Sequence, residues 1–112
     1  MAPAPRLAVE YRPLAEVRVD PGNPHTHPDD QVAGIARSIE AFGFDNPILV
    51  GPDGVIIAGE ARRLAAERLG LAEAPVIVLG HLTPAQRQAF RIADNKLGSV
   101  EVHLELMMAV PA

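Results

Sequence analysis

The spacing of apolar residues changes from one segment of the chain to the next, and each spacing predicts a different element. Residues 14–19 alternate between apolar and polar side chains, which predicts a short strand. Residues 28–42 instead carry apolar side chains every three or four positions, which predicts a helix. Gly43 suits the end of that helix because glycine readily adopts the backbone conformation that closes one.

Two short apolar runs, residues 47–50 and 55–58, flank the turn Gly51-Pro-Asp-Gly54. Asp-Gly between two such runs is typical of a β-hairpin. The second run leads directly into residues 60–69, whose apolar positions again follow a helical period. Residues 75–79 form a further apolar run of strand length and predict another strand.

The last predicted helix begins at a capping box, in which Thr83 and Gln86 can each satisfy a backbone N–H of the other. Pro84 suits the first helical position, and we expect the helix to run to about Leu97. The elements together predict an α/β (α+β) fold with a small mixed sheet, of three or four strands, and three main helices.

Composition along the chain predicts three parts. Residues 1–10 are rich in Ala and Pro and are expected to form a flexible N-terminus, and residues 11–100 a single domain. Residues 101–112 carry apolar side chains at helical spacing and predict a C-terminal helical tail. Because the chain has no apolar run typical of a signal peptide or a membrane span, we expect a cytoplasmic protein.

Charge and cysteine content narrow the chemistry that the chain can perform. The formal net charge is −4, so the chain is not a globally basic nucleic-acid binder, and an anion site must be a local cluster of arginines. Cysteine is absent, which excludes disulfides, thiolate metal sites and cysteine nucleophiles. Apolar residues make up 48% of the chain and aromatic residues only 4%, so a core would consist of aliphatic side chains.

The junction between a predicted strand and a predicted helix is the strongest candidate site. Gly59 follows the apolar run 55–58, and Glu60, Arg62 and Arg63 lie in the first turn of the helix. Unpaired N–H groups at a helix start attract anions, and two arginines there add charge-assisted donors. Glu60 could orient an arginine, ligate a metal or act as a base. Alternatively, Glu60, Arg63 and Glu67 form an ordinary salt-bridged surface.

Two other polar clusters have simpler explanations. His25, His27, Asp29 and Asp30 are potential metal ligands, but loop histidines before a proline-started helix are more often solvated or capping residues. The residues alone therefore give no certain metal site. Arg87 and Arg91 are four residues apart and could contact nucleic-acid phosphates, although a solvated helix face is the commoner explanation.

The order of the segments resembles a known family over roughly residues 11–100. The strings that carry the resemblance are the Asn-Pro-His loop from Asn23, the strand Asn46-Pro-Ile-Leu-Val50, VIIAGEARRLAAERLG (55–70) and TPAQRQAFRIADNKL (83–97). They are similar to the ParB/sulfiredoxin-like superfamily. Within it they resemble the ParB N-terminal-type (ParB-like nuclease) domain, including copies found beside DNA methyltransferases.

This resemblance implies a nucleotide site at the Gly-Glu-Arg-Arg-type helix start, with CTP or another nucleotide as ligand and magnesium as its counterion. Gly59 and Glu60 match the first two positions of the family motif, and Arg62 matches its second arginine. Sulfiredoxin carries its catalytic cysteine at the place of Glu60, so sulfinic-acid reduction is excluded here. The predicted nucleotide- and phosphate-binding residues are Gly59, Glu60, Arg62, Arg63, Asn46, Asp94 and Asn95.

Three functions of different classes follow. The first is a nucleotide-binding, DNA-associated accessory module of partitioning, phage or DNA-modification systems. Its partners would be DNA, a DNA methyltransferase or another protein, and the chain could form oligomers. The second is an enzyme of the same fold, a nucleotide hydrolase, phosphotransferase or nuclease, with Glu60 as its catalytic residue. The third is a protein-interaction module whose nucleotide site has decayed. The first hypothesis is the one that the motif favours.

Overall fold

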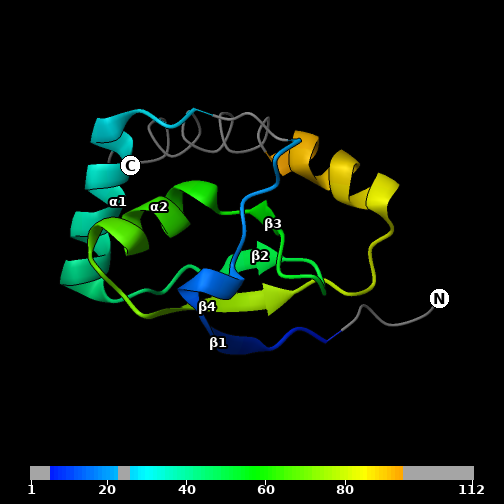
Figure 1. The fold of residues 1–112 in the computed structure, drawn as a ribbon, viewed down its shortest axis with the longest axis horizontal. Coiled ribbons are helices and arrows are strands. Elements are labelled where there is room, and N and C mark those ends of the chain that lie inside the picture. The colour runs from blue at the N-terminus through cyan, green and yellow to red at the C-terminus, as the bar shows by residue number, and fades with distance from the viewer. Residues whose placement is uncertain (1–5, 23–25, 95–112) are drawn as a thin grey trace, which may run out of the picture. The chain divides into compact units, whose positions relative to one another are not determined.

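A four-stranded mixed sheet organises the first of two compact units, Met1–His81 (Figure 1). The computed structural model describes residues 6–22 and 26–94. The strands lie in the order β1-β4-β2-β3, and β4 runs antiparallel to β1 and parallel to β2. Their bounds are β1 Val9–Pro13, β2 Ile48–Val50, β3 Ile56–Ala58 and β4 Glu73–Val78.

The helices of this unit are α1 (Asp29–Phe42), α2 (Glu60–Arg68) and the short 3₁₀ helix η1 (Leu14–Glu16). One cluster of buried residues joins α2 and η1 to the sheet, and a second joins α1 to α2. In Figure 1, α1 accordingly lies beside α2. The first cluster consists of Leu14, Val17, Ile48, Val50, Ile56, Ala66, Ala74 and Val76.

The second compact unit, Leu82–Ala112, contains a helix that covers residues 84–94 of the described chain. Its start has the predicted capping box. The Thr83 N–H donates to Gln86 Oε1 at 2.9 Å, and the Gln86 N–H donates to Thr83 Oγ1 at 3.1 Å. The predicted end of this helix near Leu97 and the tail 101–112 lie outside the described residues.

The predicted α/β class, with a small mixed sheet and three main helices, is confirmed, and so is the hairpin. β2 and β3 pair antiparallel around Gly51–Gly54, and the Gly54 N–H donates to the Gly51 carbonyl at 2.9 Å. Within the described residues, no helix is both long enough and apolar enough to pass through a membrane.

The strand predicted over residues 14–19 is wrong. The strand lies earlier, at Val9–Pro13, and residues 14–16 form η1. This 3₁₀ turn is closed by the Val17 N–H, which donates to the Leu14 carbonyl at 3.1 Å. Leu14 and Val17 are three residues apart, so a 3₁₀ turn brings both side chains to the core. Of the predicted strand only an isolated bridge between Arg18 and Val55 remains.

Candidate phosphate-binding site

Gly59 connects β3 to α2 in a left-handed backbone conformation, with φ of 106°. A Cβ atom at this position would lie 2.7 Å from Arg62 Nη1 and 3.2 Å from the Cα atom of Ile48. Only glycine fits such a position without strain, because it has no Cβ and populates positive φ readily. The absence of a side chain at Gly59 therefore lets the guanidinium of Arg62 and the backbone of Ile48 approach the helix start closely.

The first turn of α2 offers backbone donors at this point. The earliest intrahelical hydrogen bond there runs from the Arg63 N–H to the Gly59 carbonyl at 3.1 Å. The N–H groups of residues 60–62 precede it and have no acceptor within the helix. Gly59 has no side chain with which to cap them. Together with the positive end of the helix dipole, these N–H groups form a place where an anion is stabilised.

The guanidinium of Arg62 lies directly beside Gly59. Its Nη1 donates to the Pro47 carbonyl, at the start of β2, at 2.8 Å. This bond holds the arginine head group in a half-buried position, so that its charge stays near the helix start. A fixed guanidinium beside the backbone N–H groups of a helix start is an arrangement that recognises phosphate or carboxylate oxygens.

Arg63 makes a different set of contacts. Its Nε donates to the Val17 carbonyl at 2.5 Å, and its Nη1 donates to Glu67 Oε2 at 2.8 Å. The first bond connects α2 to the segment that follows η1, and the second lies within α2. Arg63 lies within the predicted motif, but its donors hold the fold together, and its part in ligand binding stays a prediction.

Glu60 faces His27, which the sequence indicated only as a potential metal ligand, in a loop that the family resemblance places near the nucleotide. Its Oε2 lies 3.8 Å from Nε2 of His27, and the two side chains are only 15% and 17% exposed. His27 stands in the loop before α1, 33 positions earlier in the chain, and no local sequence signal connects the two. Among the residues that the structure describes, no group of three or more His, Cys, Asp or Glu could hold a metal ion.

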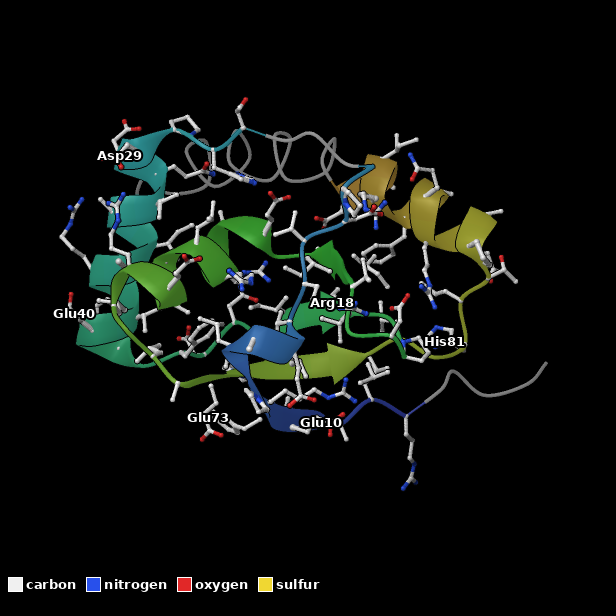
Figure 2. The ribbon with its side chains drawn as sticks, in the orientation of Figure 1. Glu10, Arg18, Asp29, Glu40, Glu73 and His81 are labelled. Carbon is white, nitrogen blue, oxygen red and sulfur yellow. The ribbon has the colours of Figure 1, made fainter. Side chains whose placement is uncertain are left out.

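An open pocket of about 520 Å³ adjoins His27 and lies between the beginning of α1 and α2. An ion pair between Arg68 and Asp29 lies across it (Asp29 is labelled in Figure 2). The pocket is lined by His27, Asp29, Val32, Leu64, Glu67 and Arg68.

The remaining predicted site residues are Asn46, Asp94 and Asn95. Asn46 is exposed and directly precedes Pro47, the acceptor of the Arg62 hydrogen bond. Asp94 is an exposed residue of the helix in the second unit, and Asn95 and His25 lie outside the described residues. The structure thus brings Gly59, Glu60 and Arg62 together at one helix start.

Comparison with known proteins gives the same family for most of the chain. Residues 6–95 match the ParB N-terminal domain. The ParB-like nuclease domain-containing protein YnaK of Escherichia coli K12 is 46% identical over 83 residues, which cover 74% of this chain and 95% of that protein. The chromosome-partitioning protein ParB of Myxococcus xanthus is 37% identical over 94 residues, which cover 80% of this chain and 31% of that protein.

Solved structures agree with this comparison. C-terminally truncated ParB from Caulobacter crescentus, complexed with CTP-γ-S, superposes with a TM-score of 0.69 at 30% identity, over 79% of this chain and 52% of that one. Sulfiredoxin from Arabidopsis thaliana has a TM-score of 0.60 at 24% identity, over 65% of this chain and 85% of that one, and shows a similar fold. The chain therefore spans about a third to a half of the partitioning proteins that it matches.

Proposed function

Because this chain belongs to the ParB N-terminal domain family, we propose that it binds a nucleotide whose phosphates lie at the start of α2. Gly59, the N–H groups of residues 60–62 and the guanidinium of Arg62 would hold the phosphates, and CTP is the first candidate ligand. The observation that carries this proposal is that the guanidinium of Arg62 is held against Gly59 at the helix start. It occupies the space that a Cβ at residue 59 would take, and it donates to the Pro47 carbonyl.

A related protein supports the choice of ligand. The Caulobacter ParB structure was obtained with CTP-γ-S, and a second structure of that protein was obtained with the centromeric parS site. For this chain we propose a DNA-associated accessory role in a partitioning, phage or DNA-modification system. Magnesium would neutralise phosphate charge, with Glu60 beside it. Two further points stay predictions. One is a DNA methyltransferase as partner, and the other is ligand contact by Asn46, Arg63, Asp94 and Asn95.

The test is a titration of CTP, ATP and ADP, with and without magnesium, that follows the free energy of unfolding. A ligand at 100 times its dissociation constant stabilises the folded state by about 2.7 kcal/mol. We expect such stabilisation for the wild type and none for Arg62→Ala. Arg37→Ala is the matched control, because Arg37 is an exposed arginine of α1 outside the site.

If Arg62→Ala keeps the full stabilisation, the phosphates bind elsewhere. If no nucleotide stabilises the wild type, the proposal fails, and the third hypothesis, an interaction module with a decayed site, takes its place.

An enzyme of the same fold is the second candidate, and the Glu60–His27 pair favours it. The Glu60 carboxylate and the His27 imidazole lie 3.8 Å apart beside the proposed phosphate site. Either group could serve as the general base that takes a proton from an attacking water. The measurements are phosphate release from each nucleotide and nicking of supercoiled plasmid. Activity that disappears in Glu60→Gln, while nucleotide binding persists, would favour an enzyme over a binding module.

A further inference from the structure

Strand β1 forms one edge of the sheet, and its outer side has no strand partner within the described residues. Figure 1 shows it at the lower edge, beside β4. The N–H of Leu14 donates to the Ala72 carbonyl at 2.9 Å, which fixes the direction of the backbone groups along β1. Because these groups alternate in an antiparallel ladder, those of Val9, Tyr11 and Pro13 point away from β4. Except for the proline nitrogen, they can pair with another strand.

The side chains of β1 alternate in character as well. Val9 and Tyr11 lie on one face of the sheet and are 55% and 61% exposed. Glu10 and Arg12 lie on the other face, where Arg12 Nη2 is 3.2 Å from Glu10 Oε1 (Glu10 is labelled in Figure 2). The edge therefore carries one negative and one positive side chain, placed symmetrically on either side of Tyr11.

We propose that β1 pairs antiparallel with β1 of a second copy of this chain, about a two-fold axis at Tyr11. In this register Glu10 faces Arg12 of the other copy, and Arg12 faces the other Glu10. Opposite charges directly across a strand pair stabilise it. Four backbone hydrogen bonds form: two between the Tyr11 residues, and one from each Val9 N–H to the Pro13 carbonyl of the other copy. The two sheets become one continuous sheet of eight strands.

The charges exclude the neighbouring registers. A two-fold axis at Glu10 would place the two Glu10 carboxylates opposite each other, and an axis at Arg12 would do the same for two guanidinium groups. Like charges directly opposite destabilise a strand pair. Pro13 ends the strand and lacks an N–H, so it prevents further extension of the pairing. A closed two-fold dimer, rather than an open fibre, is the result.

Cysteine cross-linking tests the register, since the chain contains no cysteine of its own. Hydrogen-bonded antiparallel pairs have Cα atoms about 5.5 Å apart, within the range that a disulfide can bridge. Tyr11→Cys should therefore form a covalent dimer under mild oxidation. Val9→Cys is the matched control, because it leaves both charges in place. Residue 9 pairs with Pro13 of the other copy, so the two introduced cysteines would be offset by about 13 Å along the strands and should stay monomeric. Cross-linking of Val9→Cys, or of neither variant, would overturn the proposal.

Charge reversal tests the same contact without a covalent bond. Sedimentation of the wild type in a concentration series up to about 1 mM should show a weak monomer–dimer equilibrium. Glu10→Arg or Arg12→Glu should weaken dimerisation about tenfold, because each places like charges across the axis twice. The double variant, which exchanges the two charges, should restore it. A wild type that stays monomeric throughout, or a double variant as weak as the single ones, would contradict the inference, whether or not the chain binds a nucleotide.

Discussion

At the scale of single residues, Gly59 is the position on which the proposed site depends most. Gly59→Ala should lower the free energy of unfolding by about 1–3 kcal/mol and remove nucleotide-induced stabilisation, because the new Cβ meets Arg62 at 2.7 Å. Gly70→Ala is the control. Gly70 also has positive φ, at 71°, but a Cβ there meets nothing within 4 Å. It should destabilise less and leave ligand binding intact. Equal ligand responses in the two variants would show that the close approach has no part in binding.

The two arginines of the motif should behave differently. Arg63→Ala leaves the Val17 carbonyl without its charged donor and removes the Glu67 contact, so the free energy of unfolding should fall by about 1–3 kcal/mol in urea denaturation. Although the motif predicts Arg63 as a ligand contact, its donors are bonded to Val17 and Glu67, so the gain in stability on adding nucleotide should persist. Arg62→Ala should show the opposite pattern, with the nucleotide response lost. A lost nucleotide response in Arg63→Ala would instead make Arg63 a ligand contact.

The sequence predicted the glycine of this site but not the partners of its charged residues. Gly59 could be predicted because a glycine between a buried strand and a helix has a local cause. The contacts of Arg63 with Val17 and of Glu60 with His27 join positions 46 and 33 residues apart. Helical spacing within α2 indicated two pairs, Glu60 with Arg63 and Arg63 with Glu67. The structure shows the Arg63–Glu67 pair, and Glu60 faces His27.

At the scale of elements, periodic patterns predicted the helices and the hairpin. They could not predict which strands pair when the strands lie far apart in the sequence. β1 lies on an edge with exposed side chains, so burial imposes no alternation on its sequence. Its partner β4 begins 60 residues after the end of β1, at Glu73, and no turn signal joins them. The apolar and polar side chains of residues 14–19 do not alternate because of a strand. Leu14 and Val17 are apolar because a 3₁₀ turn places both of them in the core.

The capping box of the helix over residues 84–94 gives a prediction at the same scale. Thr83→Ala removes the acceptor of the Gln86 N–H and should lower the stability of this helix by about 1 kcal/mol. Amide hydrogen exchange should speed up within the helix and stay unchanged in β4 and α2. Thr83→Ser keeps the hydroxyl and should exchange like the wild type. Faster exchange throughout both units would mean that the two unfold together.

At the scale of the whole molecule, net charge limits what the chain can do with DNA by itself. The formal net charge is −4, so attraction to DNA must come from local arginines against an overall repulsion. We therefore expect weak binding that involves about two or three phosphates. Its affinity should fall about ten- to fiftyfold as salt rises from about 50 to about 200 mM, because neutralised phosphates release counterions. Fluorescence anisotropy with a labelled duplex measures this slope, with and without CTP. Tight binding that does not change with salt would contradict an electrostatic contact, and the DNA would then be held by contacts to its bases.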